Sequence, residues 1–206
     1  LTMSVAALRV VESETGVRPS LAAGHSLGEY SALVCSGAID FAAAVKAVRL
    51  RGTFMQEAVP VGVGAMAAIL SAEAEALVEI CAEAAQGEIV APANYNSPGQ
   101  IVIAGHASAV NRAIEIAKGK GYRKAMLLPV SAPFHCSLMQ PAADRLKAVL
   151  AGLSYQKMLL PVVTNVEARA NDDCSRVQEL LVTQVCAPVL WEQSVNAMIQ
   201  SGVTRF

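Results

Sequence analysis

The order of apolar and polar positions in the first sixty residues predicts helices around one short buried strand. Apolar residues at helical spacing indicate a helix over residues 3–14. Residues 20–24 are typical of a short buried strand, and the helix that follows is expected to end at Gly37. Asp40 is suited to cap the next helix, which extends to about Val59. This alternation predicts the start of an α/β unit.

The pattern changes at about residue 64 and predicts a second, smaller unit. Its expected elements are a strand at 65–70, a helix at 72–85, strands at 89–94 and 100–104 around a turn, a helix at 107–119 and a strand at 124–129. This β-α-β-β-α-β order is that of a ferredoxin-like unit. We therefore predict a ferredoxin-like insert over residues 61–129, within a larger α/β unit formed by residues 1–60 and 130–206.

The larger unit resumes after the insert. A helix at 137–150, a buried strand at 161–166, and helices at 177–185 and 191–201 are expected, with a further strand beginning at 203–206. A strand at the last residues, with Leu1 in place of a methionine at the start, leads us to expect a piece of a longer chain.

Composition narrows the classes of partner. The 206 residues are 54% hydrophobic and carry a net charge of −1, so neither nucleic acid nor a membrane is indicated as a partner. No apolar run is long enough to span a bilayer and no signal peptide is visible. The five cysteines have no CxxC spacing, which argues against a zinc site or a disulfide framework and favours buried, reduced thiols in the cytoplasm.

A Gly-x-Ser-x-Gly motif at Gly24-His25-Ser26-Leu27-Gly28 lies between the predicted strand and helix. A nucleophile elbow requires this context, because the sharp turn lifts the serine hydroxyl to the tip of the sheet. The alternative is that Ser26 only caps a helix.

Three histidines are candidates for the base that such a serine needs. His25 is adjacent to Ser26, and neighbouring side chains usually point apart. His106 is expected in a solvated turn of the insert. His135 lies at a strand-to-helix junction of the larger unit, where such sheets place their sites, so it is the preferred base. A capping or core role is the alternative for His135.

No carboxylate is evident as a third member, so a Ser–His dyad is expected, with a backbone carbonyl as a possible orienting group. Arg51 lies on the same predicted helix as Met55. Beside a site, its planar fork would suit a carboxylate. A surface arginine paired with a residue such as Glu57 is the alternative, and composition alone favours it.

Several stretches together resemble the malonyl-CoA:acyl-carrier-protein transacylase family. They occur in the family's order and spacing and are residues 23–33, 49–56, 94–105, 129–135 and 161–166. The resemblance implies an α/β-hydrolase-like subdomain with a parallel sheet and a ferredoxin-like insert. It also implies a malonyl transferase of fatty acid synthesis, with malonyl-CoA and acyl carrier protein as partners and no resident cofactor.

The resemblance also assigns roles to particular residues. It implies Ser26 as nucleophile, His135 as base and the backbone N–H of Leu27 as an oxyanion donor. It puts Arg51 at the malonyl carboxylate, against the surface interpretation. Met55 would line the acyl pocket, and Phe134 would exclude a 2-methyl group.

The family pattern also extends beyond both ends. It implies a Gly-Gln-Gly-Ser-Gln segment with the second oxyanion donor before Leu1, and a Gly-Pro-Gly segment after Phe206. The alternatives are a serine ester or thioester hydrolase, the acyltransferase domain of a polyketide synthase, and a non-catalytic docking module.

Overall fold

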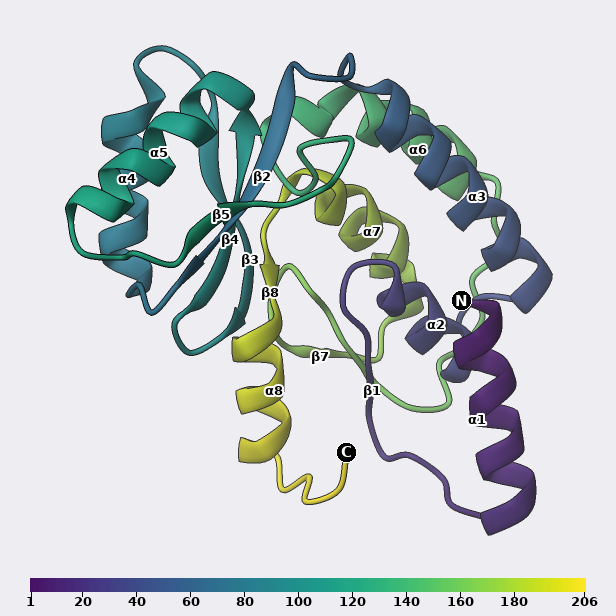
Figure 1. Ribbon diagram of the computed structural model, residues 1–206. Coiled ribbons are helices and arrows are strands. Elements are labelled where there is room, and N and C mark those ends of the chain that lie inside the picture. The colour runs from purple at the N-terminus through teal and green to yellow at the C-terminus, as the bar shows by residue number, and fades with distance from the viewer.

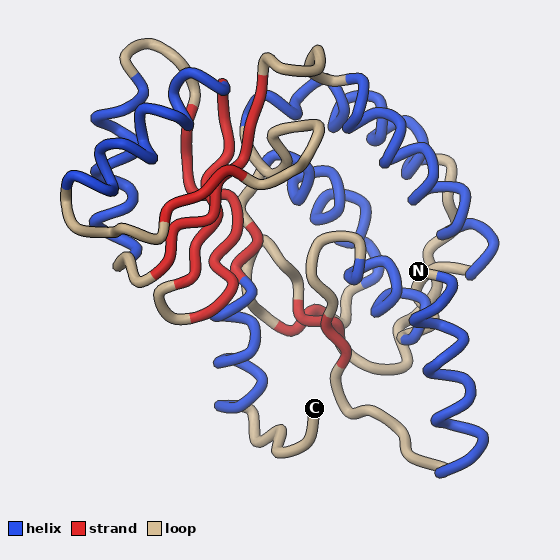
Figure 2. Tube along the Cα trace, viewed as in Figure 1, coloured by secondary structure: helices blue, strands red, loops and turns tan.

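The computed structural model describes residues 1–206 and contains two sheets surrounded by helices (Figures 1 and 2). The larger sheet has the strand order β5-β2-β4-β3-β8. Its strands are β2 (Gly64–Leu70), β3 (Val90–Ser97), β4 (Gln100–His106), β5 (Ala125–Leu127) and β8 (Val189–Leu190). The smaller sheet has the order β1-β6-β7, from β1 (Ala22–Ala23), β6 (Val162–Val163) and β7 (Ala170–Asn171).

The first four strands of the larger sheet are antiparallel and have the ferredoxin-like arrangement, in which the first strand lies between the third and the fourth. Helices α4 (Ala74–Ala85) and α5 (Ala107–Gly119) pack together on one face of this sheet, as Figure 1 shows. The apolar faces of these helices and strands form one core, which includes Leu77, Ile80, Ile103 and Val110. The predicted β-α-β-β-α-β order is therefore present, whereas the boundaries at residues 61 and 129 stay a prediction.

Strand β8 was not predicted, and it joins the two parts of the chain. It pairs in parallel with β3, so that Val189 lies opposite Asn94 and Leu190 opposite Tyr95. The pairing fixes the residues before α8 (Trp191–Gln200) against the sheet that carries Asn94.

Six helices complete the fold besides α4 and α5, and the last of them packs against β3 of the larger sheet. They are α1 (Thr2–Thr15), α2 (Gly28–Cys35), α3 (Phe41–Glu57), α6 (Gln140–Ala151), α7 (Val177–Cys186) and α8 (Trp191–Gln200), with short 3-10 turns at Ser137–Met139 and Cys174–Arg176. Asp40 caps α3 as predicted, because its carboxylate accepts hydrogen bonds from the N–H groups of Ala42 and Ala43. The central core of this part includes Tyr30, Ile39, Leu146 and Leu181.

The strands of the larger unit are shorter than predicted. Only residues 22–23 and 162–163 form the parallel pair, and β7 pairs antiparallel with β6. The predicted strand at 203–206 is wrong: these residues pair with no neighbouring strand, and Phe206 is 78% exposed. Apolar composition predicts burial, but a strand also needs a neighbour for its backbone hydrogen bonds.

The helices and cysteines show two further properties. None of the helices combines the length and the apolar character needed to cross a bilayer. All five cysteines are free, although Cys35, Cys174 and Cys186 are partly exposed rather than buried.

Candidate active site

The turn that carries Ser26 joins β1 directly to α2. Ser26 has a positive φ of 51°, an uncommon conformation for a residue with a side chain. A Cβ at Gly24 would overlap the carbonyl group of Gly28, so glycine is required there. A Cβ at Gly28 itself would meet open space. The close approach thus explains the first glycine of the motif and not the second.

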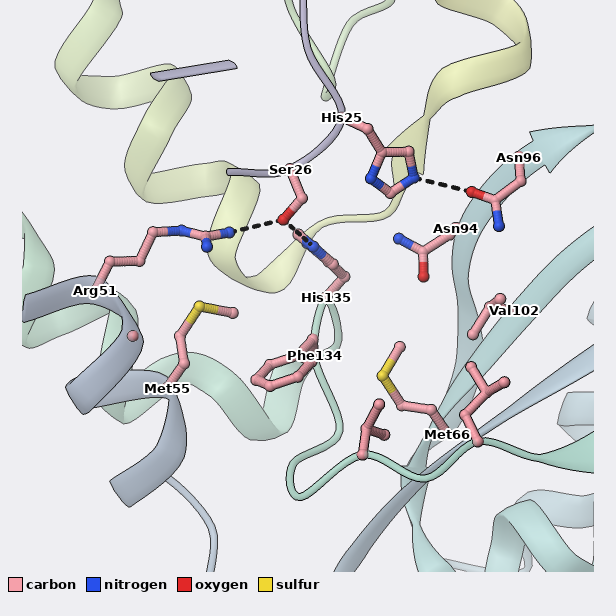
Figure 3. Close-up of a pocket in the computed structure, with 13 residues that line it drawn as sticks. His25, Ser26, Arg51, Met55, Met66, Asn94, Asn96, Val102, Phe134 and His135 are labelled. Carbon is pink, nitrogen blue, oxygen red and sulfur yellow. Dashed lines mark hydrogen bonds between the residues drawn. The ribbon is translucent and has the colours of Figure 1, made fainter. Parts of the chain in front are cut away.

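Ser26 and His135 lie in hydrogen-bond contact although 109 residues separate them. The distance from Ser26 Oγ to His135 Nε2 is 2.8 Å, as drawn in Figure 3. His135 is only 4% exposed, and it also has a positive φ, of 60°. This pair has the geometry in which an imidazole can remove the hydroxyl proton.

The other ring nitrogen of His135 contacts backbone. Nδ1 lies 2.9 Å from the carbonyl oxygen of Gln184 on α7. Because a carbonyl can only accept, Nδ1 carries the proton and Nε2 is left free to accept from Ser26. Burial, assisted by the positive charge of Arg51, lowers the pKa of His135 to about 4. The imidazole is therefore neutral at physiological pH.

Arg51 reaches the same hydroxyl from α3. Its Nη2 donates to Ser26 Oγ at 2.9 Å and to Gln184 Oε1 at 3.1 Å. Arg51 is 6% exposed, and burial lowers its pKa. Because Arg51 is buried, the interpretation of it as a surface arginine is wrong. Its expected surface partner, Glu57, pairs instead with Arg145 at 2.6 Å.

A cavity of about 470 Å³ opens beside these three side chains (Figure 3). Its other lining residues are Met55, Met66, Val102, Leu128, Val130 and Phe134 on the apolar side, and His25, Gly52, Asn94 and Asn96. Met55 and Phe134 therefore line the cavity beside Ser26, and their roles toward an acyl group stay predictions. Leu27 does not line the cavity with its side chain, but its backbone N–H donates no hydrogen bond within the chain.

Comparison with known proteins gives a match along the whole chain. The acyl transferase domain model matches residues 1–206.

The chain belongs to the acyl transferase domain family.

Three relatives illustrate the likeness. Malonyl CoA-acyl carrier protein transacylase of Escherichia coli K12 is 51% identical over 203 residues, which is 98% of this chain and 66% of that protein. The solved malonyl CoA-acyl carrier protein transacylase of Coxiella burnetii is 46% identical, with a TM-score of 0.96 over 98% of this chain and 64% of that one. A malonyl-transacylase solved in complex with a type II polyketide synthase acyl-carrier protein is 49% identical, with a TM-score of 0.94 over 97% of this chain and 65% of that one.

The chain spans just under two thirds of the length of these relatives. The mixed α/β fold of this acyl transferase domain is therefore shared with solved malonyl transacylases.

The other two histidines of this acyl transferase domain do not contact Ser26. His25 points away toward Asn96, with Nε2 at 2.9 Å from the amide oxygen. His106 was expected to be solvated and is instead half-buried, because its Nδ1 accepts a hydrogen bond from the N–H of Ile89 at 2.9 Å.

Sequence reasoning missed three buried polar residues around the site, namely Glu29, Asn165 and Gln184. One signal for Gln184 was present. Buried residues of α7 recur at helical spacing at Val177, Leu180, Leu181 and Val185, and Gln184 occupies a position on that apolar face. A polar residue at such a position needs a buried hydrogen-bonding partner.

The side chains of this domain do not assemble a metal-binding cluster: no three of His, Cys, Asp or Glu come together as ligands. At Ser26 the structure brings together a hydroxyl, an imidazole and a guanidinium group, next to the unpaired N–H of Leu27.

Proposed function

We propose that the protein transfers a malonyl group from malonyl-CoA to the phosphopantetheine thiol of acyl carrier protein in fatty acid biosynthesis, through a malonyl ester on Ser26. The observation that carries this proposal is the double contact of Ser26 Oγ, at 2.8 Å from His135 Nε2 and 2.9 Å from Arg51 Nη2. A base and a fixed cation at one hydroxyl suit an acyl donor that bears a carboxylate. The names of the relatives support the same substrate class.

In the first half-reaction, Ser26 Oγ attacks the thioester carbonyl of malonyl-CoA while His135 Nε2 takes the hydroxyl proton. The carbonyl oxygen becomes an oxyanion, and the free N–H of Leu27 supplies one donor to it. The carbon–sulfur bond then breaks, His135 returns the proton to the departing sulfur, and coenzyme A leaves. The malonyl ester remains on Ser26.

In the second half-reaction, the phosphopantetheine thiol of the carrier protein occupies the position that coenzyme A left. His135 takes the thiol proton, sulfur attacks the ester carbonyl, and Ser26 regains its proton when the ester bond breaks. The two half-reactions use the same groups, which gives a ping-pong scheme.

Arg51 selects the acyl group in this proposal. Its guanidinium would turn from Ser26 Oγ to the malonyl carboxylate, a contact strengthened by burial since the arginine is only 6% exposed. Met55 and Phe134 line the same cavity and would surround the methylene carbon of malonyl. Phe134 would then obstruct a 2-methyl branch.

The partner and the compartment follow from the same proposal. One similar protein has been solved in complex with an acyl-carrier protein, which supports a carrier protein as the acceptor. The five free cysteines support a reducing compartment, so we place the enzyme in the cytoplasm. The reaction as written needs no resident cofactor.

The test is to trap the acyl-enzyme. The protein that contains this chain is mixed with malonyl-CoA, and mass spectrometry locates the malonyl ester, with Ser26→Ala as the control that cannot be acylated. The isolated ester is then given water alone or a carrier-protein thiol. Slow decay in water and rapid transfer to the thiol are expected. Rapid decay in water alone would favour a hydrolase, and no labelling would favour a docking module.

A further inference from the structure

Glu29 is a buried carboxylate that the mechanism above does not use. It is the second residue of α2 and is only 1% exposed. Acidic residues in a first helical turn usually remain in water near the helix N-terminus. Here burial raises the pKa of Glu29 to about 7, against the lowering effect of its hydrogen bonds and of Arg51. Burying a carboxyl group costs free energy, so the position of Glu29 needs an explanation.

The carboxylate oxygen Oε2 of Glu29 joins two distant segments. It accepts a hydrogen bond from the backbone N–H of Asn165 at 3.0 Å and one from Nε2 of Gln184 at 2.8 Å. Asn165 follows β6, and Gln184 lies on α7. Both donors are N–H groups, so Glu29 acts as the acceptor in both contacts.

The two partners of Glu29 hold the backbone on each side of Ser26. Asn165 Oδ1 accepts from the N–H of Ser26 at 2.6 Å, and Asn165 Nδ2 donates to the carbonyl of Gly24 at 2.8 Å. Gln184 Nε2 donates to the carbonyl of Ser26 at 3.0 Å. The strained turn is thus held by contacts that converge on one carboxylate.

Gln184 also contacts the two side chains that face Ser26. Its backbone carbonyl lies 2.9 Å from His135 Nδ1, and its side-chain Oε1 accepts from Arg51 Nη2. The amide must therefore present its oxygen to Arg51 and its NH₂ group to Ser26. A carboxylate beside the NH₂ group enforces this orientation, because a flipped amide would turn its oxygen toward Glu29 and its NH₂ toward Arg51.

We propose that Glu29 is a positioning residue, which orients the Gln184 amide and the Asn165 turn so that Ser26 and His135 meet in reactive geometry. The inference rests on the proposed function only in taking Ser26 as the nucleophile.

The experiment measures how fast a fluorophosphonate probe labels Ser26 in the protein that contains this chain, per folded molecule. Glu29→Met keeps the side-chain volume and removes the acceptor, and it is expected to slow labelling about tenfold to a hundredfold, as small displacements of reacting groups do. Glu29→Gln keeps an acceptor oxygen and should label within about threefold of wild type, by the same reasoning. Labelling of Glu29→Met at the wild-type rate would overturn the proposal.

Leu33→Ala is the matched control for loss of stability. Leu33 lies one turn further along α2, is 3% exposed, and makes no contact with the cavity. This variant is expected to unfold at lower temperature while its folded fraction labels at the wild-type rate. Equal slowing in Leu33→Ala and Glu29→Met would reduce Glu29 to a purely structural role.

A double-mutant cycle tests the route through Gln184. If Glu29 acts by orienting that amide, Glu29→Met should slow labelling much less in a Gln184→Ala background than in wild type. Fully independent effects would overturn this route. If Glu29→Met does not fold, Glu29→Asp replaces it. The aspartate side chain is one methylene shorter, so its carboxylate lies further from Gln184 and Asn165, and this variant should also slow labelling.

The probe requires neither malonyl-CoA nor a carrier protein. Failure of the proposed malonyl transfer and failure of this positioning role are therefore separate results.

Discussion

The backbone carbonyl of Gln184 lies 2.9 Å from Nδ1 of His135, in the place where a catalytic triad would have a carboxylate. A carbonyl orients the ring and fixes its tautomer without adding negative charge. Burial and the nearby Arg51 guanidinium disfavour an imidazolium ion more than the backbone hydrogen bonds of the ring favour one, so the pKa of His135 is lowered. The structure therefore pairs a neutral imidazole with a fixed cation at one hydroxyl.

Replacing Arg51 should change which acyl group is transferred. Arg51→Ala is expected to reduce malonyl transfer by about tenfold to a hundredfold, the usual value of a charge-assisted contact with a carboxylate, and to raise acetyl transfer relative to malonyl. The measurement is kcat/KM for malonyl-CoA and acetyl-CoA. Arg49→Ala, at an exposed position of the same helix, is the control. Equal loss for both donors would count against a carboxylate contact.

The rate of Ser26 acylation should resist mild acid. His135 acts as a base only when neutral, and its pKa is lowered to about 4, so activity should persist well below pH 6.5 and fall toward pH 4. Arg51 is the second largest cause of the lowering, so Arg51→Ala should move the acid limb upward. Rapid-mixing measurements of acylation from pH 4 to 8 test this. A midpoint at pH 6.5 in the wild-type protein would contradict it.

The free energy of unfolding should depend on pH through two groups, His135 and Glu29, whose effects oppose each other. His135 has a pKa of about 4 in the folded protein, below its ordinary value of 6.5. Its contribution to the free energy of unfolding is therefore complete above pH 6.5 and is lost as the pH falls toward 4. Glu29 has a raised pKa of about 7, so it favours the folded state at low pH and disfavours it as the pH rises from 4.5 to 7. The two effects oppose each other between pH 4.5 and 6.5.

Glu29→Gln removes one of these effects. We expect its free energy of unfolding, measured by denaturant at pH 7 and pH 5, to fall more on acidification than that of the wild type. An identical pH dependence in both proteins would contradict the assignment.

Phe134 should contribute to discrimination against branched acyl groups. Phe134→Ala enlarges the cavity and is expected to raise transfer of methylmalonyl relative to malonyl by at most about a hundredfold, since one methyl group is worth about 1–3 kcal/mol. The ratio of kcat/KM for the two thioesters is the measurement. Leu128→Ala enlarges the same cavity elsewhere and serves as control. A similar change of the kcat/KM ratio in both variants would mean that Phe134 does not itself obstruct the methyl branch.

The two glycines of the motif should differ sharply in tolerance. Gly24→Ala places a methyl group against the Gly28 carbonyl and should lower the free energy of unfolding by about 1–3 kcal/mol or more. Because the same turn carries Ser26, the variant should also slow the labelling of Ser26. Gly28→Ala meets open space on a helix and should be nearly neutral or slightly stabilising. Thermal unfolding and fluorophosphonate labelling of both variants provide the comparison, and equal behaviour would contradict the steric explanation.

Local rules were enough for the features that depend on near neighbours in the chain. The turn at Ser26, the Asp40 cap and the helices follow from backbone sterics, capping and periodicity within about ten residues. Elimination among three histidines also selected His135, which lies against Ser26. The shortness of β1 and β6 and the presence of β8 could not be predicted in this way, because β1 pairs with β6 (Ala22 with Val162) and β8 with β3 (Val189 with Asn94), far away along the chain.

The sequence by itself thus determined the motif, the helices, the longer strands and the small set of residues able to do chemistry. Only the tertiary structure decided that Arg51 is buried against Ser26 and that the carbonyl of Gln184 contacts His135. It also decided that the carboxylate of Glu29 accepts a hydrogen bond from the Gln184 amide. The physical reason is that a hydrogen bond acts over about 3 Å in space, whatever the separation of its partners along the chain.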